Sequence, residues 1–206
     1  TFGGAYSNHL HATAYACKEN NLKSIGVIRG SVPAVPELSH AKNNKELNDT
    51  LTDCENYGMQ LHFISRDEYN RKTDNDFIEH LKNKFGEFYL IPEGGANYEG
   101  IWGCKEILEE VEEKYDFICC AAGTGTTLTG LLLSLRENEK LIGFPALKGG
   151  EFIKEEVEKN FQNYFPDQKI KINQLELICD YHFGGYAKVN DELKNFVQDF
   201  FSQTNI

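Results

Sequence analysis

Apolar and polar residues follow two different periods along the chain. Short runs rich in β-branched and aromatic residues alternate with longer segments in which apolar residues recur every three or four positions. The short runs predict strands, and the longer segments predict amphipathic helices. Strands are predicted at residues 24–29, 59–65, 88–92, 117–122, 141–146 and 175–179, and helices at 43–57, 68–85, 98–115, 126–135, 151–161 and 190–201.

The repeated succession of strand and helix predicts the fold class. A helix that links two strands of one sheet makes them parallel, and right-handed crossovers place helices on both faces of that sheet. We therefore expect an α/β protein with mostly parallel sheets and helices on both faces. A weak break near Gly86, where a charged helix ends, divides the chain into residues 1–86 and 87–206.

Composition and charge narrow the classes of partner. The 206 residues are 40% hydrophobic and 26% charged, which is typical of a globular protein with a buried core. A net charge of −11 argues against binding to a phosphate backbone. No apolar run reaches the roughly 20 residues of a membrane span, and no leader is evident. We expect a cytoplasmic protein with neither nucleic-acid nor membrane partners.

The six cysteines do not predict a metal or redox centre. None of them forms a CxxC pair, the usual arrangement in zinc sites and dithiol motifs. Cys119 and Cys120 lie inside an apolar run, so we expect both to be small buried residues. Free thiols of this kind fit a reducing compartment.

The segment at residues 1–9 is the first of four glycine-rich segments, and it combines glycines with several polar groups. Ser7, Asn8 and His9 follow Gly3 and Gly4 at the start of a predicted helix. A helix N-terminus favours an anion such as a carboxylate, and the glycines let a ligand approach the backbone. The alternative is that Ser7 or Asn8 simply caps the helix.

The segment at residues 121–130 predicts a phosphate site. It follows the most apolar strand and offers backbone N–H groups and threonine hydroxyls at a helix start. A Walker loop would need a lysine before Ser or Thr, and the spacing of Gly123, Gly125 and Gly130 differs from the dinucleotide fingerprint. The segment therefore predicts binding of one phosphate group rather than of a dinucleotide.

The other two glycine-rich segments are weaker signals. Residues 92–100 predict a tight strand-to-helix turn with Asn97 as the N-cap, and a functional role for Asn97 or Glu93 is the less favoured interpretation. Residues 181–188 place Tyr186 after two glycines, which by themselves favour an ordinary turn with a half-buried tyrosine.

Taken in this order, the four segments resemble the family of 1-aminocyclopropane-1-carboxylate (ACC) deaminase and D-cysteine desulfhydrase. That family depends on pyridoxal 5′-phosphate and has the two-domain fold type II of the tryptophan synthase β subunit. The resemblance covers the whole chain. It implies that residues 1–86 form mostly the small domain and residues 87–206 the large domain.

The resemblance also assigns roles to matching residues. Ser7 and the residues after it would receive the substrate carboxylate, Asn8 would bond the phenolic oxygen of the cofactor, and the ring of Tyr186 would face the substrate. His9 matches the desulfhydrase form of the family. The implied site comprises catalytic Ser7 and Tyr186, substrate-binding Ser7, Asn8 and His9, cofactor-binding Asn8, Gly123, Thr124, Gly125, Thr126 and Thr127, and no metal ligand.

Two departures from the family pattern bear on activity. Tyr6 stands where the family usually has glutamine, and no lysine precedes the Ser7-Asn8 pair, where the family has its Schiff-base lysine; Lys18 and Lys23 follow the pair. A second family tyrosine and the group that bonds the pyridine nitrogen would lie beyond Ile206. We therefore expect a chain that lacks the N- and C-terminal parts of the large domain and is inactive by itself.

The resemblance implies a lyase or deaminase that acts on a small amino acid, and a homodimer. D-Cysteine would yield pyruvate, ammonia and hydrogen sulfide, whereas ACC would yield 2-oxobutyrate and ammonia. His9 favours the desulfhydrase reaction. The alternatives are a non-catalytic protein that binds pyridoxal phosphate or phosphate, and another fold type II enzyme related to cysteine synthase.

Overall fold

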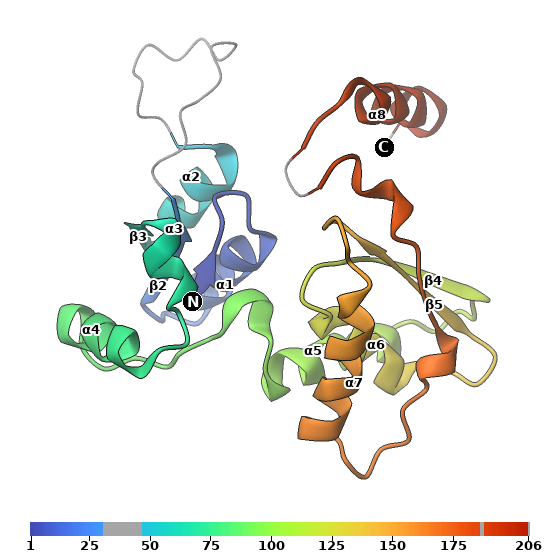
Figure 1. Cartoon of the computed structure of the whole chain (residues 1–206), viewed down its shortest axis with the longest axis horizontal. Helices are drawn as coiled ribbons and strands as arrows, with labels where there is room; N and C mark the ends of the chain where they lie inside the picture. Colours follow the sequence, from blue (N-terminus) through green and yellow to red (C-terminus); the bar gives the residue numbers. More distant parts are fainter. Residues whose placement is uncertain (31–46, 186–187, 206) are drawn as a thin grey trace. The chain divides into compact units, whose positions relative to one another are not determined.

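The computed structural model describes residues 1–30, 47–185 and 188–205, and it divides into two compact units. The first unit comprises Thr1–Gly95 and the second Ala96–Ile206. In Figure 1 the chain runs from blue and cyan through green in the first unit and on to red in the second. Whether the units match the small and large domains expected above stays a prediction.

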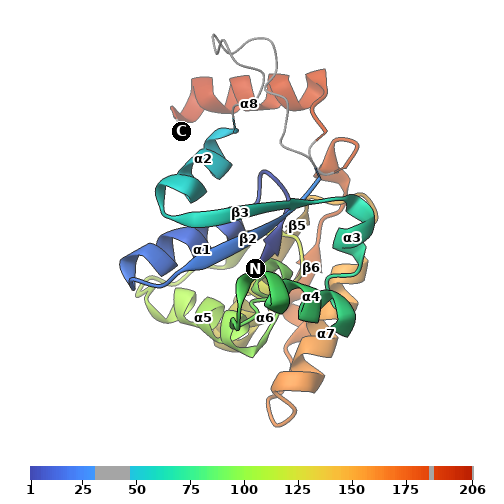
Figure 2. The same ribbon diagram turned by 90° about the vertical axis from the view of Figure 1, so that its left-hand side faces the viewer.

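The first unit is built on a three-stranded parallel sheet. Its strands are β1 (Phe2–Gly3), β2 (Ser24–Arg29) and β3 (Met59–Ile64), in the order β1-β2-β3. β2 and β3 pair along their whole length, from Ser24 opposite Met59 to Arg29 opposite Ile64 (Figure 2). The described helices of this unit are α1 (Asn8–Glu19), α2 (Asp49–Asn56), α3 (Arg66–Asn70) and α4 (Asn75–Phe85), followed by the single 3-10 turn η1 (Glu93–Gly95).

Helices cover both faces of this first sheet. Successive residues of a strand point to opposite faces, and Val27 and Ile28 of β2 accordingly enter two different clusters. Ile28 packs with buried residues of α1 and α2, whereas Val27 packs with residues of α3 and α4. The arrangement confirms the predicted α/β class with helices on both sides of a parallel sheet.

The second unit repeats the arrangement of parallel strands and helices. Its strands β4 (Phe117–Ala122), β5 (Lys140–Pro145) and β6 (Leu175–Leu177) form a parallel sheet in the order β4-β5-β6. Its described helices are α5 (Tyr98–Glu109), α6 (Thr126–Ser134), α7 (Phe152–Tyr164) and α8 (Asp191–Thr204), with the 3-10 turns η2 (Ile172–Gln174) and η3 (Asp180–His182). No helix in the described part of the chain is long and apolar enough to cross a bilayer.

The exposure of Cys119 corrects a prediction. Ile118, Leu141 and Leu175 lie in register across the sheet and join the cluster formed with α5, α6 and α7. Cys119 points the other way, in register with Ile142, and this face of β4 is exposed. Cys119 is therefore exposed, and Cys120 is only partly buried. The prediction was wrong because an apolar run indicates a strand but does not indicate which face of it the helices cover.

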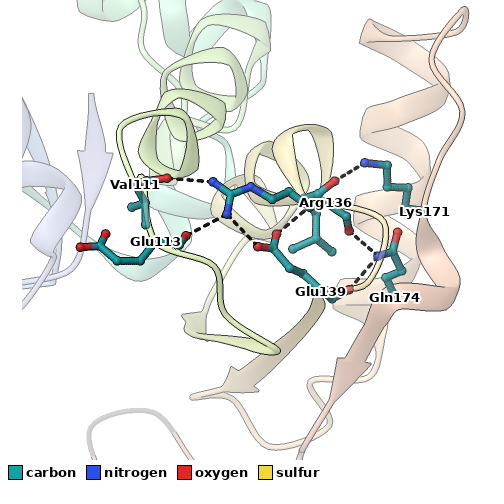
Figure 3. Close-up of polar contacts among 7 residues, drawn as sticks. Val111, Glu113, Arg136, Glu139, Lys171 and Gln174 are labelled. Atoms are coloured by element: carbon teal, nitrogen blue, oxygen red, sulfur yellow. Dashed lines mark hydrogen bonds and ion pairs between the residues drawn. The ribbon is translucent and has the colours of Figure 1, made fainter.

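A network around Arg136 holds the connection between α6 and β5 (Figure 3). The guanidinium of Arg136 donates to two carbonyl groups just after α5, and Nη1 lies 3.4 Å from the buried carboxylate of Glu139. Gln174 Nε2 donates to three carbonyl groups of the connection, at 2.7–3.1 Å. The carbonyl groups in the network belong to Val111, Glu113, Leu135, Arg136, Glu137 and Glu139, with Lys171 donating to that of Leu135.

Three predicted elements differ in the structure. The helix predicted at 68–85 is two helices, because Ser65 and Glu68 form a capping box that starts α3 early and the chain turns before Asn75. Residues 88–92 do not form a strand: Phe88 and Leu90 pack on the first core, but the segment pairs with no strand in the described part of the chain. The helix predicted at 98–115 ends at Glu109. Part of the helix predicted at 43–57 lies outside the described residues.

Candidate functional site

The first candidate group lies at the carboxyl edge of the first sheet. β1 ends at Gly3, and a turn with Ser7 N–H bonded to the Gly4 carbonyl at 3.1 Å leads into α1. Ser7 is the N-cap of α1, and its hydroxyl accepts from Leu10 N–H at 3.3 Å. The alternative interpretation, in which Ser7 or Asn8 caps the helix, is thus confirmed for Ser7. Because the hydroxyl oxygen accepts this bond, its proton is still available to donate to a ligand. Asn8 is exposed at the first turn of the same helix.

Gly3 is required by the close approach of β1 to α1. A Cβ at this position would lie 2.8 Å from side-chain carbons of Leu10 and from the Ser7 hydroxyl oxygen. At such distances the side chains of Leu10 and Ser7 would have to shift. The glycine predicted to let a ligand approach therefore has a packing function too: it lets the polar start of α1 sit against the strand end.

His9 connects the glycine-rich segments at residues 1–9 and 92–100. Its Nε2 lies 2.8 Å from the Thr1 hydroxyl, and its ring packs against Gly95 of η1, where a Cβ would lie 3.4 Å from the imidazole. Burial lowers the pKa of His9, against the opposing charge of Glu93. The structure therefore favours a neutral imidazole at this position.

The lowered pKa of His9 predicts how stability depends on pH. Since the unfolded chain binds a proton at this histidine more readily than the folded chain, the stabilising contribution is present above the ordinary histidine pKa of about 6.5 and is lost as pH falls below it. In urea unfolding, the free energy of unfolding of the first unit should fall as the pH is lowered below about 6.5, and it should fall less in His9→Gln. His62, whose pKa burial also lowers, contributes to the remainder, so an unchanged slope in His9→Gln would contradict the assignment.

A charged cluster not predicted from the sequence lies at the same edge of the first sheet. Arg29 is the last residue of β2, and its Nη2 would lie 3.8 Å from a Cβ at Gly4. Its guanidinium carbon is 5.5 Å from the centre of the Tyr69 ring, and the Tyr69 hydroxyl donates to Glu93 at 2.8 Å. A positive charge therefore lies beside the turn before α1. The position of Arg29 at a strand's carboxyl end was the sequence signal that could have identified it.

The second candidate group lies between β4 and α6, at the carboxyl edge of the second sheet. Gly125 is the N-cap of α6 and has a left-handed backbone, with φ 83°, which favours glycine. Among the described residues no side chain caps the helix, so the first N–H groups of α6 have no acceptor within the helix and are available to one outside it. Gly123 has nothing within 4 Å of the position that a Cβ would take. This end of α6 has the form of an anion-binding site.

Hydroxyl groups surround the same helix start. The hydroxyl oxygens of Thr124 and Thr126 lie 2.8 Å apart, and the Thr127 hydroxyl lies 3.8 Å from the Cys104 thiol of α5, which donates to it. Together with the uncapped N–H groups, these hydroxyls provide the donors that a phosphate group requires. The residues present therefore fit the phosphate of pyridoxal phosphate.

The structure brings the predicted residues together within each unit. Ser7, Asn8 and His9 share the start of α1, and Gly123, Thr124, Gly125, Thr126 and Thr127 share the start of α6. Tyr186 lies outside the described residues. Asn97 is the N-cap of α5, as predicted, with its side chain accepting from Gly100 N–H at 2.9 Å. No group of three or more metal-ligating side chains occurs within residues 1–30, 47–185 and 188–205.

Comparison with known proteins identifies relatives of the chain. The profile of the family described as "Pyridoxal-phosphate dependent enzyme" matches residues 2–175. A Thermotoga maritima protein named for ACC deaminase is 30% identical over 206 residues, which is 93% of this chain and 62% of the relative. The mitochondrial bifunctional D-cysteine desulfhydrase/ACC deaminase of Arabidopsis thaliana is 33% identical over 146 residues, 65% of this chain and 35% of the relative.

Solved structures show the same relationship. The crystal structure of an ACC deaminase homologue matches with a TM-score of 0.77 and 27% identity, covering 100% of this chain and 62% of that one. A pyridoxal 5′-phosphate-dependent aspartate racemase, at 19% identity and a TM-score of 0.52, shares the fold over 77% of this chain and 43% of its own. The chain spans 60–62% of the length of two curated relatives that it matches over nearly its whole length.

Proposed function

From the premise that the chain belongs to the family of pyridoxal-phosphate dependent enzymes, we propose that it forms part of a lyase or deaminase acting on a small amino acid. The observation that carries the proposal is the uncapped start of α6, with Gly125 in a left-handed conformation and three threonine hydroxyls beside it. When bound, pyridoxal phosphate supplies an electron sink for a substrate carbanion. The protein must hold its phosphate, its ring and the substrate carboxylate.

The proposal gives each group of residues a binding function. The N–H groups and hydroxyls of residues 123–127 bind the cofactor phosphate, since they form an anion site at a helix start. Asn8 bonds the phenolic oxygen of the cofactor, and the hydroxyl of Ser7 with the start of α1 receives the substrate carboxylate. His9 helps to bind the substrate as a neutral imidazole, and Tyr186 faces the substrate. The support for these roles is the match of each residue to the family pattern.

The proposed substrates are D-cysteine and ACC. Relatives of the chain carry both names, and His9 matches the desulfhydrase form, so D-cysteine is the first substrate to test. The resemblance alone supports a homodimer. A non-catalytic protein of the same fold that binds pyridoxal phosphate or phosphate is the second candidate, since the anion-binding form of the α6 start supports binding without requiring catalysis.

Calorimetric titration of the polypeptide of residues 1–206 tests the binding part of the proposal. Pyridoxine 5′-phosphate keeps the ring and the phosphate of the cofactor but has no aldehyde to react with surface lysines, and pyridoxine is the matched control without phosphate. We expect the phosphorylated compound to bind at least about tenfold more tightly, equivalent to about 1.4 kcal/mol. Equal affinities for the two compounds would contradict a phosphate site at α6.

The same polypeptide tests the second candidate. With pyridoxal phosphate added, we expect it to release neither sulfide from D-cysteine nor 2-oxobutyrate from ACC, because no lysine stands before Ser7 to act as the positioned base. Turnover by residues 1–206 alone would show that another group performs this function. A longer protein that carries an upstream lysine and still fails with both substrates would favour the binding protein.

A further inference from the structure

A buried threonine lies directly beneath the start of α6. Thr129 is 0% exposed and lies between Leu128 and Gly130 in the helix. Its hydroxyl donates to the carbonyl oxygen of Gly125 at 2.9 Å, and its own N–H reaches the same oxygen at 2.9 Å. The N–H alone satisfies the carbonyl as an ordinary helical bond. The Thr129 hydroxyl is therefore a second donor to a carbonyl oxygen that already accepts one hydrogen bond.

A side chain from another helix fixes the direction of this hydroxyl. Asn160 of α7 donates through Nδ2 to Thr129 Oγ1 at 3.2 Å. A hydroxyl that accepts from Asn160 directs its own proton elsewhere, and the Gly125 carbonyl lies in that direction. The contacts thus form a chain that runs from the Asn160 amide through the Thr129 hydroxyl to the Gly125 carbonyl, and they tie the glycine to α7 as well as to α6.

The geometry of the peptide bond transmits the constraint on the Gly125 carbonyl to the N-terminus of α6. The carbonyl of Gly125 and the N–H of Thr126 belong to one planar trans peptide and point in opposite directions. Two donors that hold the carbonyl toward the body of α6 therefore hold the Thr126 N–H toward the helix end. Gly125 has no side chain that could otherwise restrict its backbone, which makes an outside constraint effective.

We propose that Thr129 and Asn160 are positioning residues for the phosphate site, which keep the peptide between Gly125 and Thr126 turned so that its N–H faces the phosphate. The inference rests on the proposed function of the α6 start. It assigns a function to two residues that do not themselves touch the ligand. It also explains why a polar side chain occupies a fully buried position in the helix, where burial of an unbonded hydroxyl would be costly.

Four variants of residues 1–206 test the proposal. Thr129→Val keeps the shape and removes the hydroxyl, Thr129→Ser keeps the hydroxyl, and Asn160→Ala removes the donor from α7. Ser134→Ala is the matched control, since the Ser134 hydroxyl makes the same kind of bond to a carbonyl four residues earlier, at 3.4 Å, farther along α6. Each variant is titrated with pyridoxine 5′-phosphate and with inorganic phosphate, and its thermal unfolding is recorded.

We expect Thr129→Val to weaken the binding of both ligands about fivefold, the equivalent of one hydrogen bond of about 1 kcal/mol. Asn160→Ala should weaken both about twofold, whereas Thr129→Ser and Ser134→Ala should bind like the unchanged protein. An amide resonance of Thr126 that shifts in Thr129→Val and returns in Thr129→Ser would support the positioning role directly. This signal does not depend on bound ligand.

Different failures have different meanings. If the unchanged protein binds pyridoxine 5′-phosphate no better than pyridoxine, the proposed function of the site fails and the inference fails with it. If the unchanged protein shows the phosphate preference and Thr129→Val retains it in full, the inference alone is wrong. Affinity losses that follow the loss of stability equally in all four variants, Ser134→Ala included, would likewise overturn it.

Discussion

Gly130→Ala is expected to destabilise the second unit by about 2 kcal/mol, because α5 and α6 approach too closely there to admit a methyl group. A Cβ at Gly130 would lie 2.5 Å from both Cys104 Cβ and the Ile101 carbonyl oxygen. The carbonyl belongs to the backbone of α5, so the helices must separate to relieve the overlap. The gain in helix propensity of about 1 kcal/mol offsets only part of this cost. Thermal unfolding followed by circular dichroism should show a decrease of about 10 °C in Tm.

Gly103→Ala on the facing helix is the matched control. Gly103 lies within α5, and a Cβ there meets nothing within 4 Å. Here the helix propensity acts without any overlap, so we expect stability to rise by up to about 1 kcal/mol. Equal effects of the two substitutions would show that α5 and α6 are not in close contact at Gly130.

Gly125→Ala is expected to reduce the affinity for pyridoxine 5′-phosphate at least about tenfold. Its φ of 83° is unfavourable for alanine by about 1–2 kcal/mol, and the new methyl group would meet Ile153 and Val157 of α7 at 3.4 Å. The backbone can relieve this strain by rotating the peptide before Thr126, which turns its N–H away from the helix end. This rotation removes one hydrogen-bond donor from the phosphate site, and titration calorimetry measures the resulting loss of affinity.

Gly58→Ala is the control for Gly125→Ala, since it introduces the same backbone strain at a position away from the proposed phosphate site. Gly58 has a φ of 85°, nearly that of Gly125, but it lies before β3 in the first unit with open space around its Cβ position. Alanine there should lower stability by a similar amount and leave phosphate affinity unchanged. A comparable loss of affinity in Gly58→Ala would mean that general destabilisation, and not the shape of the α6 start, explains the result at Gly125.

The secondary-structure elements of the candidate site could be predicted from the sequence more fully than the long-range side-chain contacts within it. The apolar run before Gly123 and the glycines and threonines after it were sufficient to predict a strand, a turn and a helix start, because each depends on local preferences. The bond between Thr1 and His9 and the support of Thr129 by Asn160 could not be predicted, since each depends on how distant elements pack. The apolar run at 88–92 wrongly predicted a strand: Phe88 and Leu90 pack on the first core, but pairing with a neighbouring strand depends on distant residues, and the described part of the chain provides none.

The network around Arg136 has a consequence for protein engineering. Residues 136–139 include three charged side chains and join a helix to a strand, so they resemble the exposed connections where affinity tags and reporter insertions are usually tolerated. Here the backbone carbonyls of the connection are held by Gln174 and its arginine by the segment after α5. An inserted tag would draw these carbonyls away from their donors and separate three segments at once. The turn after α1, where Leu22 is 64% exposed, offers a place for a tag that leaves such a junction intact.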